Sequence, residues 1–421
     1  MKSLETLIQE LCPDGVEYVK FKDCCDYIRG ITYNKSKEVF NDDEPSWRVL
    51  RANNITLSNN QLNFSDVKKV SKEVRVKDSQ ILRLGDILIC AGSGSKNHIG
   101  KVAYIDRDID CTFGGFMAVI RSLKVSTRFL FHILTSSSFK QYLSLALNSS
   151  TINNLSSSVM ENFEIPLPPL EIQAEIVRIL DKFTELEAEL EAELEARKRQ
   201  YEYYRDRLLT FDTRGGVSGP VEWKKMSEVC VSTGRIKWHT AIGNYLYIDL
   251  ASVDRNNHSI GECQTIDKSN APSRAQQIVA EGDILFGTTR PTLMRFCHIP
   301  KEYDGQVCST GFCVIRVRKD IVDSHYVYHI LFTKHFQDYV EGHQRGASYP
   351  AISDREVMNC EIPVPSLKEQ ERIANILDRF ESLTTSLAAG LPAEIAARRR
   401  QYEHYRDRLL TFRRKVARGE K

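Results

Sequence analysis

An internal repeat of nearly identical sequence limits this chain to folds built from two related halves. The stretch RQYEYYRDRLLTF (Arg199–Phe211) returns as RQYEHYRDRLLTF (Arg400–Phe412), with Tyr203 against His404 as the only difference. Most of the sequence between the two copies is dissimilar. The chain must therefore use one element twice and attach it to two divergent modules.

The repeat extends upstream of this stretch. EIPLPPLEIQAEIVRILDKF (Glu164–Phe183) matches EIPVPSLKEQERIANILDRF (Glu361–Phe380), which begins 197 residues later. Shorter echoes have nearly the same offset, namely GDIL at Gly85 and Gly282 and HIL at His132 and His329. The sequence predicts an internal duplication in the order module, helix, module, helix.

The repeated segments read as long helices. In the first, apolar residues recur every three or four positions, at Ile172, Ile176, Ile179, Phe183, Leu186 and Leu190. No helix-breaking residue lies between Leu170 and Phe211, which predicts a helix of about 42 residues and about 60 Å. Its apolar stripe needs a cover, and we expect the second repeated helix to supply it as an antiparallel coiled coil.

The second helix carries the same stripe from Ile373 to Leu409, with one added four-residue step. Gly390 and Pro392 lie at that step, so we expect a kink or an interruption there. The corresponding region of the first helix is a tandem LEAE repeat that starts at Leu186. A Glu-rich stretch is usually a solvated face, but a tandem tetrapeptide also allows helix length to change in nearly whole turns.

The predicted fold class is α+β, with two mixed modules separated by the two long helices. The expected boundaries are 1–165 for the first module, 166–211 for its helix, 212–362 for the second module, and 363–421 for the second helix and a basic tail. Short β-type runs dominate the modules, such as GDILICA, KVAYI, FMAVIRS, GDILFG and CVIRVR. Each module should contain one amphipathic helix, RFLFHILTSSSFKQYLSLAL or SHYVYHILFTKHFQDYVEG.

Composition describes an ordinary soluble chain, with 42% hydrophobic and 27% charged residues. The start MKSLETLIQEL has no signal-peptide core, and no run approaches a membrane span. The eleven cysteines are scattered without a Cys-x-x-Cys, which favours reduced thiols in a cytoplasm. The net charge of +2 does not by itself indicate nucleic-acid binding.

The familiar enzyme motifs are missing. GSGSKNHIGK (Gly92–Lys101) has one residue too many between its glycines for a P-loop, and Val102 stands where Ser or Thr is required. The FGGF at Phe113 is too short and apolar for a dinucleotide or AdoMet loop, and no Asp-Pro-Pro-Tyr or Asn-Pro-Pro-Phe occurs. We therefore expect a binding protein with no catalytic residues, cofactor or metal of its own.

The doubled signatures EIPLPPLEIQ/EIPVPSLKEQ, RILDKF/NILDRF and QYEYYRDRLLTF/QYEHYRDRLLTF resemble the specificity (S) subunit of type I restriction–modification enzymes over essentially the whole chain. The resemblance implies that each module is a target-recognition domain that reads one half of a bipartite site in double-stranded DNA. It also implies that the helices set the spacing and dock two methyltransferase (M) subunits, with restriction (R) subunits in the full complex. AdoMet, ATP and Mg²⁺ are then expected on the partner subunits.

A shared partner explains why the helices stayed alike while the modules diverged, which a merely recent duplication does not. If the halves are related by a pseudo-twofold axis, each helix presents an equivalent face to one copy of the partner. The candidate partner-binding residues are Tyr201, Glu202, Arg205, Arg207, Tyr402, Glu403, Arg406 and Arg408. The arginines among them are expected to be exposed.

Base reading needs polar and basic side chains on exposed loops. The candidates in the first module are Arg48, Arg51, Asn53, Asn54, Ser93, Ser95, Lys96, Asn97, Lys101, Thr151, Asn153 and Asn154. Those in the second are Arg235, Lys237, Thr288, Thr289, Arg290, Arg295, Arg345, Ser348 and Tyr349. The loop after GDIL is the strongest of these, although a plain solvated hairpin has the same composition.

Two other classes of function stay open at this point. One is a fused DNA methyltransferase or nuclease whose site is not recognisable from sequence. The other is a coiled-coil scaffold that binds no nucleic acid.

Overall fold

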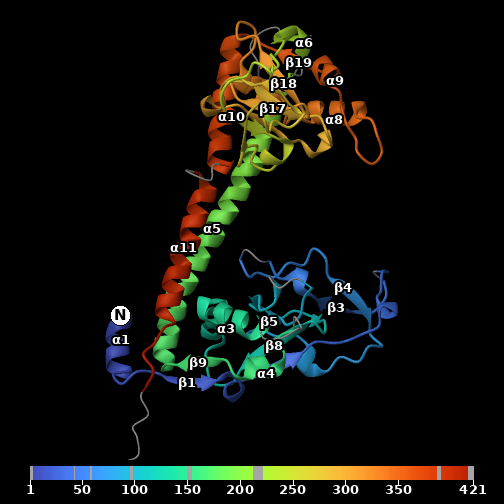
Figure 1. Ribbon diagram of the computed structural model, residues 1–421. Helices are drawn as coiled ribbons and strands as arrows, with labels where there is room; N and C mark the ends of the chain where they lie inside the picture. The colour runs from blue at the N-terminus through green and yellow to red at the C-terminus, as the bar shows by residue number, and fades with distance from the viewer. Residues whose placement is uncertain are drawn as a thin grey trace, which may run out of the picture. The chain divides into compact units, whose positions relative to one another are not determined.

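The computed structural model describes residues 3–41, 43–56, 59–94, 98–148, 154–211, 221–385 and 390–415. The chain divides into two compact units (Figure 1). Unit 1 comprises residues 1–188 and 397–421, and unit 2 comprises residues 189–396. Each unit thus combines one module with helical segments from both repeats. None of the helices in the described part of the chain is long and apolar enough to cross a membrane.

Unit 1 is built on an antiparallel sheet of four strands in the order β2-β8-β5-β6. Their bounds are Cys25–Arg29, Met117–Ser122, Ile87–Cys90 and Val102–Tyr104. A second sheet has the order β4-β3-β7, with bounds Lys68–Ser71, Ser46–Leu50 and Thr112–Phe113, and β3 and β7 are parallel. A two-stranded ribbon joins β1 (Glu17–Lys20) to β9 (Glu164–Leu167).

The predicted amphipathic helix of the first module is two helices, α2 (Thr127–Thr135) and α3 (Ser137–Asn148). The prediction of a single helix was wrong because Ser136 ends α2 in an extended conformation and its hydroxyl accepts the Phe139 amide at 3.4 Å. The other module helices are α1 (Leu4–Leu11) and α4 (Ser157–Glu161). Short 3-10 turns lie at Phe21–Asp23, Lys35–Lys37, Ala52–Asn54 and Asp78–Gln80.

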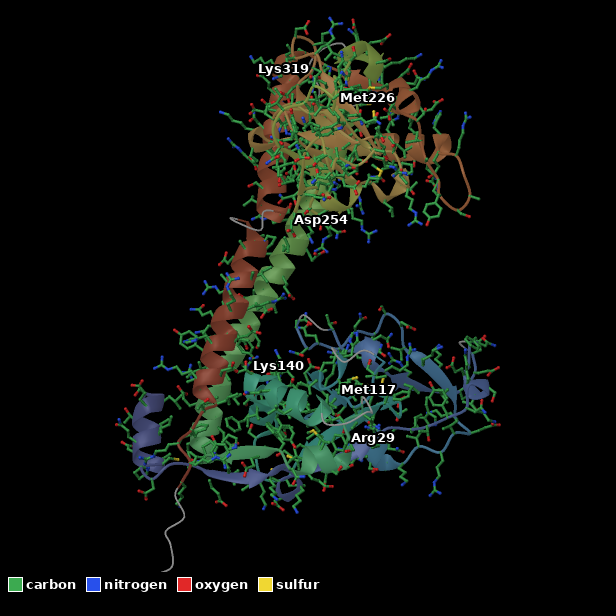
Figure 2. The ribbon with its side chains drawn as sticks, in the orientation of Figure 1. Arg29, Met117, Lys140, Met226, Asp254 and Lys319 are labelled. Carbon is green, nitrogen blue, oxygen red and sulfur yellow. The ribbon has the colours of Figure 1, made fainter. Side chains whose placement is uncertain are left out.

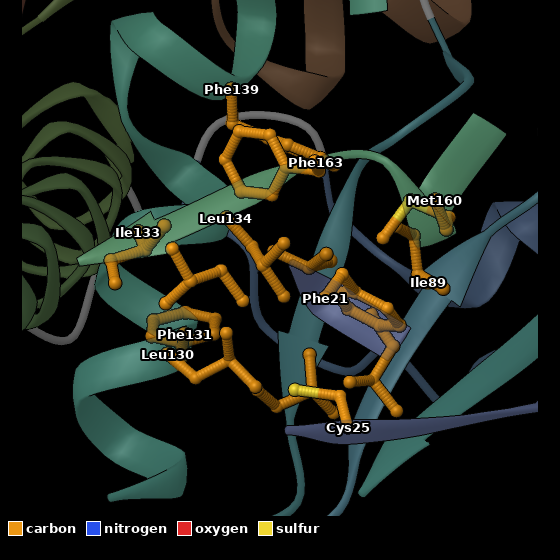
Figure 3. Packing of buried hydrophobic residues seen from close by; sticks show 14 of the residues in the cluster. Phe21, Cys25, Ile89, Leu130, Phe131, Ile133, Leu134, Phe139, Met160 and Phe163 are labelled. Atoms are coloured by element: carbon orange, nitrogen blue, oxygen red, sulfur yellow. The ribbon is translucent and has the colours of Figure 1, made fainter. Parts of the chain in front are cut away.

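Strand β5 is buried on both faces, which explains its unbroken apolar sequence. Ile87 and Ile89 belong to a hydrophobic cluster that includes residues of the helices. Leu88 and Cys90 point to the other face and belong to a second cluster, on the side of the smaller sheet. Figure 3 shows the first of these clusters, where side chains of α2 and α3 pack against residues from the sheet and from α4. The cluster also takes in the start of the long helix.

Unit 2 repeats this topology. Its main sheet has the order β11-β18-β15-β16, with bounds Cys230–Val231, Phe312–Val317, Ile284–Gly287 and Phe296–His298. Its second sheet has the order β13-β12-β17-β14, with bounds Gln264–Ile266, Tyr245–Ile248, Val307–Ser309 and Ala275–Ile278. The ribbon pairs β10 (Glu222–Lys225) with β19 (Glu361–Val364). Within the described residues, the fourth strand of the second sheet is the main departure from unit 1.

The second module also has two helices where one was predicted. They are α7 (Ser324–Ile330) and α8 (Lys334–His343), and Thr333 caps α8 through a hydrogen bond from the Phe336 amide. The remaining helices are α6 (Met226–Val229) and α9 (Asp354–Asn359). The 3-10 turns are at Leu250–Ser252, Pro291–Leu293 and Lys301–Tyr303.

The long helices follow the predicted pattern. Helix α5 spans Leu170–Leu209 and contributes its first part to unit 1 and its last part to unit 2. The second repeat forms α10 (Leu367–Thr385) and α11 (Leu391–Leu409), so the interruption expected at Gly390 is confirmed. In unit 1, α5 and α11 run antiparallel, since Phe183 stacks on Tyr405 with centroids 5.5 Å apart while Glu187 pairs with Arg399. In unit 2, Tyr204 stacks on Phe380 in the same way, at 5.5 Å.

The duplication is visible in single side chains. The GDIL glycines, Gly85 and Gly282, both have a φ of +88°, which is why glycine occupies these turns. The aspartates that follow are buried and accept two hydrogen bonds each from an arginine, in the pairs Asp86–Arg121 and Asp283–Arg316. The GDIL repeat therefore forms the same turn and the same Asp–Arg pair in both units, just before the loop that follows it.

Candidate DNA-recognition surfaces and helix joints

In both modules, the loop after GDIL pairs with a segment just before the last short module helix. Gly92 pairs with Asn154 in unit 1, and Thr289 pairs with Ala351 in unit 2, with both members offset by 197 residues. We call each pairing a loop bridge. The two bridges place different side chains at equivalent points of the same scaffold, as a pair of recognition surfaces would require.

The loop bridge of unit 2 gathers exposed basic and aromatic side chains. The guanidinium of Arg290 lies over the ring of Tyr349, 4.5 Å from its centroid, and Tyr349 is 71% exposed. The backbone amide of Arg290 donates to the carbonyl of Pro350 at 2.7 Å, and Arg345 pairs with Ala351 on the neighbouring stretch. Thr289, Arg345 and Ser348 are exposed beside them. The loop bridge of unit 2 therefore presents exposed guanidinium groups as hydrogen-bond donors, and the Tyr349 ring orients that of Arg290.

The turn that carries Arg290 is strained. Arg290 and Met294 have φ values of +49° and +48°, in the left-handed region that non-glycine residues rarely adopt. Such conformations cost about 1–3 kcal/mol each and concentrate at binding and catalytic sites. The strain is consistent with a loop selected for the position of its side chains.

The equivalent face of unit 1 is a cavity of 820 Å³ lined by Arg51, Asn53, Ser93 and Phe116, among others. Phe116 lies at the edge of this cavity and is 73% exposed. Arg29 of β2, labelled in Figure 2, donates to the carbonyls of Gly115 at 2.8 Å and Leu155 at 3.3 Å. This arginine therefore links the backbone beside Phe116 to the backbone beside Asn154 of the loop bridge.

Several further candidates are exposed or half-buried on the modules. In unit 1, Arg48 lies over Phe64 at 5.7 Å, Asn154 belongs to the loop bridge, and Arg51 and Asn53 both donate to Asp66, at 2.8 and 3.0 Å. In unit 2, Arg235 and Lys237 are exposed on the segment that precedes β12, and Arg235 pairs with Gln277. Ser95, Lys96, Asn97, Thr151 and Asn153 lie outside the described residues.

Four candidates form hydrogen bonds within the fold. Asn54 and Thr288 are buried, so the expectation that they are available on exposed loops was wrong, whereas Lys101 and Arg295 are half-buried. Asn54 is 1% exposed, accepts from the Arg51 amide and donates to two carbonyls. Lys101 donates to the Ile55 carbonyl at 2.8 Å, and burial lowers its pKa. Thr288 is buried and donates to the Gly311 carbonyl at 2.9 Å, and Arg295 donates to the Leu250 carbonyl.

Each unit also contains a joint between a module and the long helices. In unit 1, His132 of α2 lies between Asp181 of α5, at 2.8 Å from Nε2, and the Tyr402 hydroxyl of α11, at 3.0 Å from Nδ1. In unit 2, His329 bonds Asp378 at 2.7 Å and Tyr201 at 3.2 Å through the same two nitrogens. The repeated HIL, ILD and QYE sequences therefore meet in space, and we call these triads the helix joints.

The hydrogen bonds define the tautomer of the joint histidine. Burial alone would raise the pKa of Asp181, but its hydrogen bond with His132 and the charge of Arg128 outweigh burial and lower it. An ionised carboxylate only accepts, so Nε2 carries the hydrogen and Nδ1 accepts from the tyrosine hydroxyl. Burial lowers the pKa of His132 more than Asp181 raises it, so the ring is neutral near pH 7.

The partner-face prediction needs a correction in its arginines. Arg406 is 3% exposed and lies over the Tyr402 ring, and Arg205 lies over Tyr201 and Phe332 with 14% of its side chain exposed. Each arginine follows its tyrosine by four residues and so lies on the same helix face, a spacing that could have revealed this. Of the remaining candidates, Glu202, Arg207, Glu403 and Arg408 are exposed. Tyr201 is buried and Tyr402 is half-buried, and both belong to the helix joints.

Several residues that shape these surfaces and joints were not among the candidates predicted from the sequence. Phe116 was considered only as part of a failed cofactor motif, although an aromatic residue between glycines and a strand can be exposed. Arg29 and the aspartate at the helix joint carried no sequence signal beyond the repeat itself. His132 and His329 belonged to an echo, HIL, that was noted without a role.

The comparisons with known proteins agree with this architecture. The family model for the type I restriction modification DNA specificity domain matches this chain twice, over residues 13–196 and 220–397. The chain is 33% identical over 282 residues to the specificity subunit of the Escherichia coli type I restriction enzyme EcoR124I/EcoR124II, covering 61% of this chain and 65% of that protein. It is 32% identical over 310 residues to a putative type I restriction enzyme specificity subunit of Haemophilus influenzae, covering 69% and 73%.

The fold also has a counterpart among solved structures. The S subunit of a type I restriction–modification system from M. genitalium aligns with a TM-score of 0.53 over 94% of this chain and 96% of that one, at 14% identity. That likeness concerns the fold alone. With two matches of the family model that together include both modules and most of the long helices, this chain belongs to the family of type I restriction modification DNA specificity proteins.

Proposed function

We propose that this chain is the DNA-recognition subunit of a type I restriction–modification enzyme, in which each module reads one half of a bipartite target. The observation that carries the proposal is the pair of loop bridges. They occupy equivalent scaffold positions, yet one presents Thr289, Arg290 and Tyr349 while the other presents Ser93, Asn154 and Phe116. A shared scaffold with unlike polar side chains is what two different half-sites need.

The side chains suit contact with base edges and phosphates. Arginine donates two parallel hydrogen bonds to guanine O6 and N7, and asparagine pairs in the same way with adenine. Because Arg290 stacks on Tyr349 in the free chain, its guanidinium is already ordered and loses less conformational entropy when it binds DNA. The cavity beside Phe116 offers a concave surface with Arg51, Asn53 and Ser93 on its wall.

The long helices have a different role in this proposal. They separate the two modules and dock methyltransferase subunits through the exposed Glu202, Arg207, Glu403 and Arg408. Because the two helices carry the same residues, two copies of one partner are the natural stoichiometry. Restriction subunits complete the enzyme. AdoMet, ATP and Mg²⁺ belong to the partner subunits, and this chain itself is not catalytic. The complex acts in the cytoplasm.

Selection of duplexes from a random pool tests the proposal. The chain with its methyltransferase partner should enrich a target with two defined blocks and an undefined gap. Arg290→Ala should relax one block by about tenfold or more at the contacted base, because a bidentate contact supplies about 1–3 kcal/mol of discrimination. Arg318→Ala, an exposed arginine of the same module paired with Asp320, is the matched control and should enrich the wild-type target. Failure to enrich any sequence would refute the proposal.

A further inference from the structure

Among the residues that the structure describes, unit 2 contains a cluster of histidines and carboxylates that unit 1 lacks. His325 and His329 lie four residues apart on α7, and Asp378 and Glu381 lie three apart on α10. Residues at these spacings share a helix face, and the two faces meet. Nδ1 of His325 is 3.0 Å from Oδ2 of Asp378, and Nε2 of His329 is 2.7 Å from Oδ1.

Glu381 lies beside the His329–Asp378 pair, and His325 joins the group through its contact with Asp378. Among the described residues, the ligand atoms of His329, Asp378 and Glu381 all lie within 4.8 Å of one another. Bonds of about 2.0–2.2 Å to a tetrahedral metal require neighbouring donor atoms roughly 3.3 Å apart. The separations of 2.7 and 3.0 Å need to open by about 0.6 and 0.3 Å, and Glu381 needs to move inward.

The internal repeat provides a built-in comparison. The positions 197 residues earlier are Arg128, His132, Asp181 and Thr184. There, Nε of Arg128 donates to Oδ1 of Asp181 at 2.8 Å, and its guanidinium lies over Tyr104 and Phe131, at 4.8 and 5.0 Å. Unit 1 thus has a permanent cation against the joint carboxylate. Unit 2 replaces that arginine with a histidine and adds a second carboxylate.

The surroundings also suit an ion. Tyr201 contacts Nδ1 of His329, and the Tyr328 hydroxyl donates to Glu381 at 2.6 Å, so that both groups have the outer partners that orient metal ligands. His329 is buried, whereas the side chains of His325 and Asp378 are 48% and 37% exposed, which leaves a path for entry. Two imidazoles and two carboxylates are a ligand set that zinc and neighbouring divalent ions favour.

We propose that His325, His329, Asp378 and Glu381 form a binding site for a divalent transition-metal ion such as Zn²⁺, which supplies at the unit 2 joint the positive charge that Arg128 supplies in unit 1. Binding at Nε2 of His329 displaces its single ring hydrogen, which is exchanged through solvent to Nδ1, so the neutral ring releases no net proton. Nδ1 then donates to the Tyr201 oxygen. The ion links α7 to α10 and so fastens the module of unit 2 to its helix. This inference does not depend on DNA recognition.

Metal binding by the untagged, chelator-treated full chain tests the proposal. We expect one equivalent of Zn²⁺ by titration calorimetry and by elemental analysis after gel filtration. Co²⁺ should give the visible bands of a tetrahedral site without a sulfur charge-transfer band, which separates this site from the eleven cysteines. His325→Arg with Glu381→Thr installs the residues of unit 1, and it should remove the equivalent while circular dichroism stays unchanged.

Two control variants test whether the bound ion occupies this site. His239→Ala changes an exposed histidine elsewhere in unit 2 and should keep the equivalent. The converse variant, Arg128→His with Thr184→Glu, should raise the stoichiometry to two. Absence of binding by the wild-type chain, a Co²⁺ spectrum of thiolate type, or binding that survives His325→Arg would each overturn the proposal. If the double variant does not fold, the single His325→Arg change and the wild-type Co²⁺ spectrum decide.

Discussion

The helix joint of unit 1 yields a quantitative prediction for Tyr402→Phe. The change removes one hydroxyl and leaves the ring, so packing is preserved. It deprives Nδ1 of His132 of its donor at 3.0 Å, in a ring with no exposed surface. An unsatisfied buried acceptor costs about 1–3 kcal/mol. For a unit of this size, that should lower the melting temperature by roughly 2–4 °C for each kcal/mol.

The assay is thermal and urea unfolding of the full chain, followed by circular dichroism. The control is Tyr203→Phe in the other repeat, where the hydroxyl is exposed and accepts from Arg207 at 3.2 Å. That change should stay within about 0.5 kcal/mol, as surface changes usually do. A Tyr402→Phe chain no less stable than the Tyr203→Phe chain would refute the hydrogen-bonded joint.

Three further predictions concern pH, partner docking and helix length. Burial lowers the pKa of both His132 and His258 below about 6.5, the value in the unfolded chain. At a pH between the folded and the unfolded pKa, only the unfolded chain takes up these protons. Stability should therefore fall as pH drops from 7.5 to 5.5, by at most about 1.4 kcal/mol per pH unit for each proton, and a rise in the urea midpoint would contradict this. Arg207→Ala with Arg408→Ala should weaken co-purification of the methyltransferase and leave the stability of the chain unchanged, whereas Arg406→Ala should lower that stability. Equal effects of the two sets of changes on both readouts would contradict the division into exposed and packed arginines. Inserting Leu-Glu-Ala-Glu after Glu193 lengthens α5 by about 6 Å with a rotation of about 40°. Methylation mapping should then show the gap between half-sites wider by one to two base pairs of about 3.4 Å, with the half-sites unchanged, while a two-residue insertion should abolish assembly.

The sequence was sufficient for the features that depend on local spacing. The stripe from Ile172 to Leu190 predicted α5 to within two residues of its end, and Gly390 with Pro392 predicted the break between α10 and α11. The GDILICA, KVAYI and FMAVIRS runs contain the strands β5, β6 and β8, as expected. These features follow from periodicity and from backbone propensities, which a single sequence contains.

The features that depend on long-range contact were not predictable in the same way. The repeated QYE tyrosine was placed on a partner-facing surface, but its hydroxyl bonds the histidine of a module more than 120 residues away in sequence. Asn54 and Thr288 lie among plausible base-reading residues, yet the fold uses their polar groups internally. Periodicity cannot tell whether a polar side chain on a loop satisfies the backbone or faces solvent.

Mapping of methylated bases in cells that carry this chain with its partner subunits tests the central claim most directly. The wild-type chain should direct methylation to a bipartite target. Arg51→Ala with Asn53→Ala should change only one half of that target, and Thr289→Ala with Arg290→Ala should change only the other half. A continuous target, or a loss spread evenly over both halves in either variant, would contradict the assignment of one half-site to each module.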